Sequence, residues 1–214
     1  MRVMKKTWRA IAALLVAVMI LALSACGKAP ELAKVKDTFV ALVEASYEIN
    51  DIFFGEGLAV YERGGEFATK YYIYEDLPES YDLYEIVQAE SGYLSADSIK
   101  DAAAKVYSED YLAGIYTMAF DGYADGESIT TARYLEAEGY FLRYTYGEKD
   151  PFDILEGKQR RYLFDTMRIV RPSSADYVNV EVESYLLGAE NECLTITLRF
   201  TLEDGEWRLD SPTY

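Results

Sequence analysis

The clearest pattern in the chain is LTITLRFTLEDGEWRL, residues 194–209. From Leu194 to Leu202, apolar side chains alternate with Thr and Arg, which is the period of a β-strand with one buried face. Asp204-Gly205 is a strong hairpin signal, and Trp207 begins a second short strand pattern. The sequence therefore predicts two antiparallel strands joined by a tight turn.

Three earlier segments extend this sheet. Residues 140–146 and 162–171 are rich in aromatic and β-branched side chains, and valines alternate with polar residues over 178–183. One-sided alternation is typical of an antiparallel sheet with one covered face. An amphipathic helix predicted over residues 31–54 supplies the cover, because its apolar residues recur at spacings of three and four. They are Leu32, Val35, Phe39, Leu42, Val43, Ile49, Ile52 and Phe53.

Two shorter helices are predicted between that long helix and the strands. Ser95 and Ser108 have the character of N-caps, so we expect helices over residues 96–106 and 109–120. Helices followed by long antiparallel strands indicate the α+β class, with residues 31–214 forming a single domain.

Residues 58–95 give no clear structural prediction. Pro78 indicates a turn, whereas Tyr71–Tyr74 and Tyr84–Val87 are β-prone by composition. The chain has 20 tyrosines, and five of them fall between Tyr71 and Tyr84. Such a cluster either fills a sheet and its rim or forms an exposed contact surface, and we favour the first interpretation for most of these side chains.

The N-terminal residues have the organisation of a secretory signal peptide. Met1–Arg9 is basic and contains no acid, and Ala10–Leu23 is a 14-residue run without charge. This run is shorter than the roughly 20 apolar residues that span a bilayer. We therefore predict a signal peptide over residues 1–25, followed by Cys26.

LSAC, residues 23–26, resembles the lipobox of bacterial lipoproteins. This resemblance implies that Cys26 is diacylated on its sulfur and becomes the new N-terminus, with residues 26–30 as a tether. The protein is then expected at the outer face of the cytoplasmic membrane, held there by acyl chains. An ordinary cleaved signal and an uncleaved anchor are the alternatives.

The composition excludes several kinds of chemistry. The chain has no histidine, which removes Ser-His-Asp and Cys-His catalysis and every imidazole metal site. It has 37 acidic and 21 basic residues, and four of the basic ones lie in the predicted signal, so the remainder has a net charge of −20. Such a surface repels nucleic acid. We expect neither a cofactor nor a metal, and we expect Cys193 to be a small buried core residue.

The order of elements, with a long first helix and C-terminal strands, resembles the cystatin-like and NTF2-like folds. A narrower resemblance is to the IseA-type inhibitors of cell-wall DL-endopeptidases. It is carried by SIK at 98–100, VYSEDYL at 106–112, FDGY at 120–123 and FDTMRIV at 164–170. This resemblance implies a membrane-anchored, non-catalytic protein that binds and inhibits such an endopeptidase. An acidic protein also suits a basic hydrolase as its partner.

The resemblance implies that acidic loops dock into the groove of the hydrolase. The candidates are Asp121, Tyr123, Asp125 and Glu127. The same segment does not fit a calcium-binding EF-hand, because the third position would be Tyr123 and the twelfth Ala132. We therefore expect a surface hairpin turn here.

Two other functions remain open. NTF2-like folds hold a pocket between the first helix and the sheet, which implies a small-ligand site lined by Phe39, Tyr116 and Trp207. An enzyme that uses carboxylates alone ranks last, because no motif singles out a pair among so many acids. The sequence does not indicate the identity of the partner or ligand, or the oligomeric state.

Overall fold

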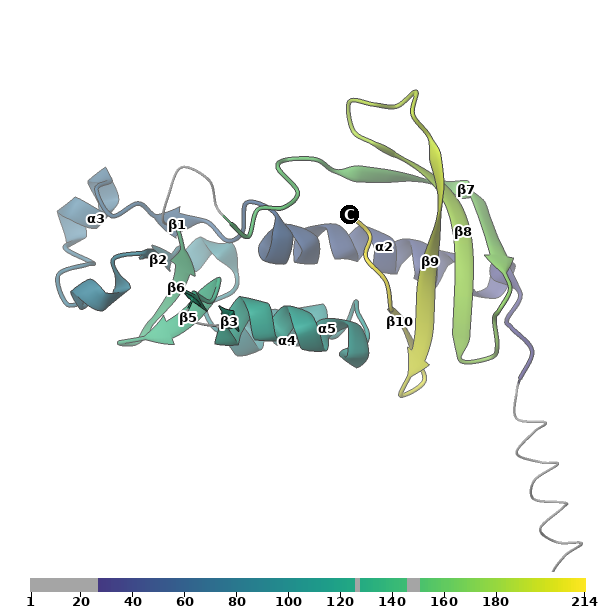
Figure 1. Ribbon diagram of the computed structural model, residues 1–214, viewed down its shortest axis with the longest axis horizontal. Helices are drawn as coiled ribbons and strands as arrows, with labels where there is room; N and C mark the ends of the chain where they lie inside the picture. The colour runs from purple at the N-terminus through teal and green to yellow at the C-terminus, as the bar shows by residue number, and fades with distance from the viewer. Residues whose placement is uncertain (1–26, 126–127, 146–150) are drawn as a thin grey trace, which may run out of the picture.

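The computed structural model describes residues 27–125, 128–145 and 151–214. It is an α+β fold, in which helices from the N-terminal part pack against two antiparallel sheets (Figure 1). The predicted class is therefore confirmed. The described strands form two four-stranded sheets and a separate two-stranded hairpin, whereas the sequence predicted one curved sheet. The cystatin-like or NTF2-like assignment stays a prediction.

Helix α2 (Leu32–Phe54) is the longest element and confirms the helix predicted over 31–54. It has 23 residues, so it spans about 34 Å at 1.5 Å per residue. Figure 1 shows that α2 begins beside strands β7 and β8 and runs toward the part of the molecule that contains strands β1, β2, β5 and β6. Phe39 is fully buried on its inner face and stacks on Phe200 with ring centroids 3.8 Å apart.

The larger sheet is formed by the C-terminal strands, in the order β10-β9-β8-β7. Their bounds are Arg160–Val170 for β7, Tyr177–Leu186 for β8, Leu194–Glu203 for β9 and Glu206–Leu209 for β10. These strands confirm the predicted pattern. Asp204 and Gly205 both have positive φ, 52° and 84°, as a tight Asp-Gly hairpin requires. The fully buried Val180, Leu198 and Phe200 show which face packs against the helix.

The smaller sheet has the order β1-β2-β6-β5. Its strands are β1 (Val60–Tyr61), β2 (Tyr84–Val87), β5 (Tyr134–Ala137) and β6 (Tyr140–Tyr144). Alternate residues of these strands enter two different hydrophobic clusters. Phe141 joins the main core with α2, whereas its neighbour Leu142 joins a second cluster with Leu77, Tyr84 and Ile86. Both faces of this sheet are therefore covered.

The two short helices are confirmed, although each is shorter than predicted. Helix α4 (Ala96–Ala103) begins with a capping box in which Ser95 accepts a hydrogen bond from the Ser98 backbone N–H. Helix α5 (Glu109–Tyr116) is capped by Ser108 and continues as the π-helical turn η3 (Thr117–Asp121).

The tyrosine-rich segment departs from its β-prone composition. It contains helix α3 (Glu66–Tyr71) and the 3-10 turn η1 (Glu79–Tyr81); a further turn, η2 (Ala89–Ser91), follows β2. The sequence left the structure of this segment open, and Tyr71–Tyr74 does not form a strand, because helix α3 ends there with Tyr72 in the left-handed region at φ 55°. Tyr74 instead packs onto the smaller sheet and donates a hydrogen bond to the Tyr61 carbonyl. By contrast, Tyr84–Val87 does form a strand.

Cys193 is exposed, which contradicts the prediction of a buried core residue. It lies just before β9, where Leu194 is also 60% exposed, because this end of the strand extends beyond the cover that the helices provide. Among the described residues, no helix is both long and apolar enough to cross a membrane.

Candidate functional site

A cleft of about 270 Å³ opens beside the C-terminal end of α2. Its walls come from three parts of the chain that are far apart in sequence, namely the end of α2, the segment that precedes β7, and the residues after β10. Asn50 and Thr213, which are 3% and 2% exposed, line its inner part. We refer to this feature as the α2 cleft.

A buried hydrogen-bond network fixes the inner part of the α2 cleft. The Thr213 hydroxyl accepts a hydrogen bond from the Asn50 amide at 2.8 Å, and it lies 2.7 Å from the Ser46 hydroxyl and 2.8 Å from the Tyr107 hydroxyl. Tyr107 also donates to the Asn50 amide oxygen at 2.7 Å. Burial raises the pKa of Tyr107 to about 12, so its phenol is protonated at neutral pH. The Tyr162 hydroxyl donates to the Thr213 carbonyl at 2.8 Å.

The outer part of the α2 cleft carries two charges of each sign. Asp51 and Glu56 stand at the end of α2, and Lys158 and Arg160 stand on the segment that enters β7. One Asp51 carboxylate oxygen accepts the Glu56 backbone N–H at 3.2 Å, and Arg160 donates to the Ser184 hydroxyl at 3.0 Å. These formal charges cancel, so the cleft favours neither a simple anion nor a simple cation.

A second feature lies at the opposite end of the molecule from the start of α2 (Figure 1). Tyr61, Phe67, Tyr71 and Tyr72 form what we call the aromatic surface. The Tyr61 and Phe67 rings stack with centroids 4.4 Å apart and an interplanar angle of 11°, and Tyr71 follows Phe67 at 4.6 Å. Phe67, Tyr71 and Tyr72 are 47%, 55% and 66% exposed. Adjoining exposed aromatic rings are typical of a contact surface.

The aromatic surface rests on a firmly held segment. The Arg63 guanidinium donates to the carbonyls of Tyr81 and Tyr84 at 3.2 and 3.3 Å and lies 4.4 Å from the centre of the Tyr74 ring. The segment is also strongly acidic, with seven acidic and two basic residues over 61–85. The acids are Glu62, Glu66, Glu75, Asp76, Glu79, Asp82 and Glu85.

The sequence left the role of this tyrosine cluster open, and the structure divides its members. Tyr74, Tyr81 and Tyr84 pack in the second cluster, as we expected for most of them, whereas Tyr71 and Tyr72 point to solvent.

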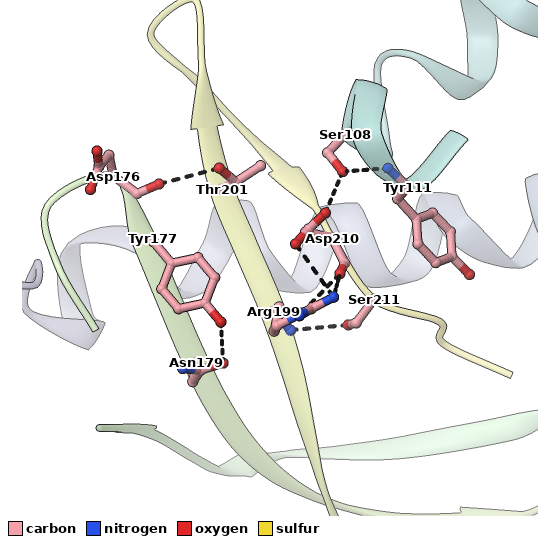
Figure 2. Close-up of polar contacts among 9 residues, drawn as sticks. All are labelled: Ser108, Tyr111, Asp176, Tyr177, Asn179, Arg199, Thr201, Asp210 and Ser211. Atoms are coloured by element: carbon pink, nitrogen blue, oxygen red, sulfur yellow. Dashed lines mark hydrogen bonds and ion pairs between the residues drawn. The ribbon is translucent and has the colours of Figure 1, made fainter. Parts of the chain in front are cut away.

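Figure 2 shows a group of polar contacts where β9 and β10 meet the start of α5. Ser108 accepts the Tyr111 backbone N–H at 3.2 Å and donates to the Asp210 carboxylate at 2.6 Å. Arg199 donates to the Asp210 carbonyl through Nε and Nη2, at 3.1 and 2.8 Å, and its backbone N–H donates to the Ser211 hydroxyl at 3.0 Å. Ser108 is fully buried, so this serine and carboxylate pair serves as a helix cap and a strand junction.

The group in Figure 2 positions the α2 cleft, because the anchored residues Asp210 and Ser211 lead directly to Thr213. On the far side of β9 in the same view, Thr201 donates to the Asp176 carbonyl at 3.4 Å and Tyr177 donates to the Asn179 amide oxygen at 3.3 Å. The first contact joins β9 to the residue before β8, the second lies within β8, and neither involves a residue that lines the α2 cleft.

Two of the predicted docking residues, Tyr123 and Asp125, lie on the first strand of a β-hairpin. Strands β3 (Tyr123–Asp125) and β4 (Ser128–Thr130) pair with Asp125 opposite Ser128, which confirms the expected hairpin. Asp121 is exposed at the end of η3. The structure does not describe the side chains of Tyr123 and Asp125. Glu127, Cys26 and the predicted signal peptide lie wholly outside the described residues.

The residues predicted to line a pocket do not come together around one cavity. Phe39 and Trp207 are in direct edge-to-face contact, with centroids 5.3 Å apart. Tyr116 instead packs against Phe53 and Phe120 at 6.2 and 5.9 Å, and its hydroxyl donates to the Lys100 carbonyl at 3.1 Å. The helix and sheet are therefore in close contact at Phe39. Of the three residues, only Trp207 lines an open hollow of about 520 Å³ between α2 and β10, beside Leu42. Sequence reasoning missed the α2 cleft.

Comparison with protein-family models and with curated proteins finds no match to this chain. Among the described residues, no group of three or more acidic or cysteine side chains could hold a metal ion. Function has therefore to be argued from the α2 cleft, the aromatic surface and the hairpin.

Proposed function

We propose that this protein is a non-catalytic binding protein, held at the outer face of the cytoplasmic membrane by a lipid on Cys26. We further propose that it binds and inhibits a basic cell-wall hydrolase of the DL-endopeptidase class. The observation that carries the proposal is the aromatic surface, which combines exposed stacked rings with a strongly acidic surrounding segment.

Aromatic side chains supply much of the binding energy at protein interfaces, because they bury a large rigid area at a small cost in conformational entropy. The aromatic surface offers three such rings that are about half exposed or more. The segment 61–85 that carries these rings has seven acidic and two basic residues, one of which, Lys70, lies 5.1 Å from the centre of the Tyr71 ring. The net negative charge of the segment favours a positively charged partner and accelerates its association at low salt.

The position of the aromatic surface supports a tethered binder. The proposed lipid attachment at Cys26 immediately precedes α2, and the aromatic surface lies beyond the other end of this helix (Figure 1). With α2 about 34 Å long, the surface is held well away from the attachment point. A partner that works in the cell wall can therefore reach it.

The test is capture of a purified basic DL-endopeptidase by the full chain in detergent, with peptidoglycan hydrolysis as a second readout. Wild-type protein should bind, should inhibit, and should lose affinity as salt rises. The double substitution Phe67→Ser and Tyr71→Ser should weaken binding about thirtyfold, the effect of losing one strong interface residue. The matched control is Leu187→Ser with Leu194→Ser, which removes two side chains that are 57% and 60% exposed elsewhere.

Equal binding by the aromatic variant and the control would show that the aromatic surface is not the interface. The hairpin is tested separately, by reversing the charges of Asp121, Asp125 and Glu127. Slower association would place the hairpin in the interface, and an unchanged rate would exclude it. A wild-type protein that neither binds nor inhibits the endopeptidase would refute the proposed function.

A further inference from the structure

We propose that the α2 cleft is a binding site for a small zwitterion, of the size of an amino acid or a dipeptide. The inference rests on the size of the cleft, the balance of its charges and the unused hydrogen-bonding capacity of its inner part. It does not depend on the aromatic surface or on the proposed endopeptidase partner.

The size of the α2 cleft limits its occupant. A volume of about 270 Å³ lies just below the range of about 300–1,000 Å³ that is typical of pockets for drug-sized ligands. An occupant of the size of an amino acid or a very small peptide therefore suits the α2 cleft. Larger ligands would extend into solvent.

The charges of the α2 cleft match a ligand that carries both signs. An ammonium group is complementary to Asp51 and Glu56 at the end of α2. A carboxylate is complementary to Arg160 at the start of β7 and to Lys158, whose ammonium also lies 3.5 Å from the Glu156 carboxylate. Arg160 uses one guanidinium nitrogen on Ser184 and retains donors in the planar arrangement that suits a carboxylate. A ligand with a single charge would satisfy one wall and face repulsion from like charges at the other.

The inner part of the cleft adds a fixed polar contact. The Asn50 amide nitrogen donates one hydrogen bond to Thr213, and the contacts of the described residues leave its second N–H free. Asn50 is held in place through its oxygen by Tyr107, so this donor is preorganised. Tyr47 and Tyr214 also line the cleft, and both rings are held in place, by the Arg161 guanidinium at 4.9 Å from the Tyr47 ring centre and by Phe54 at 4.7 Å from the Tyr214 ring centre.

The test is titration calorimetry of the full chain in detergent. The probes are L-alanine, D-alanine and L-alanyl-L-alanine, and the comparison probes are acetate, methylammonium and glucose. We expect at least one zwitterion to bind at least tenfold more tightly than every comparison probe, because removal of one charge removes one set of charge-assisted hydrogen bonds. Tighter binding of glucose or of a singly charged probe would overturn the proposal, and so would an absence of heat with all three zwitterions.

Two substitutions locate the binding. Arg160→Gln and Asp51→Asn should each weaken the zwitterion about tenfold or more. Arg168→Gln on the same strand, where Arg168 pairs with Glu181 at 2.9 Å, and Asp37→Asn on the same helix should leave the affinity unchanged. Binding that resists both cleft substitutions would place the ligand elsewhere.

Arg160 and Asp51 also make internal contacts, so their replacement could disturb the fold. The substitution Glu56→Gln reduces this risk, because the Glu56 side chain is exposed, whereas Lys158 pairs with the Glu156 carboxylate at 3.5 Å. This substitution should also weaken the zwitterion about tenfold or more, while thermal unfolding stays unchanged. The Phe67→Ser and Tyr71→Ser variant should bind the zwitterion normally, which separates failure of this site from failure of the proposed endopeptidase binding.

Discussion

The replacement Tyr107→Phe tests the hydrogen-bond network that fixes the α2 cleft. Tyr107 is 1% exposed, and its hydroxyl donates to the Asn50 amide oxygen at 2.7 Å. Phenylalanine keeps the ring and its stacking on Tyr111 at 4.7 Å, but it leaves that oxygen without a donor within the described part of the chain. An unsatisfied buried acceptor costs about 1–3 kcal/mol, so the free energy of unfolding should fall by this amount at neutral pH.

The same substitution changes the dependence of stability on alkaline pH. Burial raises the pKa of Tyr107 to about 12 in the folded protein, against 10.0 for an ordinary tyrosine. The unfolded chain therefore releases this proton first, and stability decreases as pH rises through the interval from about 10 to about 12. This loss amounts to about 3 kcal/mol for Tyr107. The phenylalanine variant has no proton to lose here, so the gap between the two proteins should close or reverse at high pH.

The assay is urea unfolding followed by circular dichroism at about pH 7, 10 and 11. Tyr72→Phe is the matched control, because Tyr72 is 66% exposed, and it should match wild type throughout. A gap between wild type and Tyr107→Phe that keeps the same size at every pH would refute the coupling of this proton to folding. The lack of a gap at neutral pH would refute the stabilising role of the hydroxyl.

Three other substitutions or reactions test local features of the fold. Gly57→Ala should reduce the free energy of unfolding by more than about 1 kcal/mol in the same urea assay, because φ is 76° at this position and a Cβ atom would lie 2.6 Å from an Arg133 guanidinium nitrogen. The control is Gly114→Ala in α5, where a Cβ atom meets no atom within 4 Å, and this variant should be as stable as wild type or more stable. Ser95→Ala should lower stability by about 1 kcal/mol through loss of the capping box, measured by thermal unfolding. Cys193 should react with a thiol reagent in the native state about as fast as in urea, and strong protection would contradict its exposure.

The parts of the fold that the sequence predicted correctly are those with local patterns. The hairpin between β9 and β10 depends on a period of two over nine residues and on Asp204-Gly205, and both signals lie within one continuous stretch. Helix α2 depends on a repeat that continues for six turns. Ser95 and Ser108 marked the starts of two helices because the cap is itself a local hydrogen bond.

The smaller sheet could not be predicted in the same way. Its strands are two to five residues long, too short for a reliable period. Its central pairing joins Tyr84 to Tyr144, so the partner of each strand is set by tertiary structure. The same limit applies to the tyrosines, because composition alone does not distinguish the buried Tyr84 from the exposed Tyr72.

The position of the α2 cleft does have a sequence signal, in the face of the helix that packs inward. Val35, Phe39 and Val43 form an apolar face, and the Phe39 ring stacks directly on Phe200 of the larger sheet. Further along the helix, the buried positions also include the polar Ser46 and Asn50. Buried polar side chains require partners, and here they draw in Thr213. The polar part of the α2 cleft therefore forms where buried serine and asparagine interrupt the apolar face of the helix.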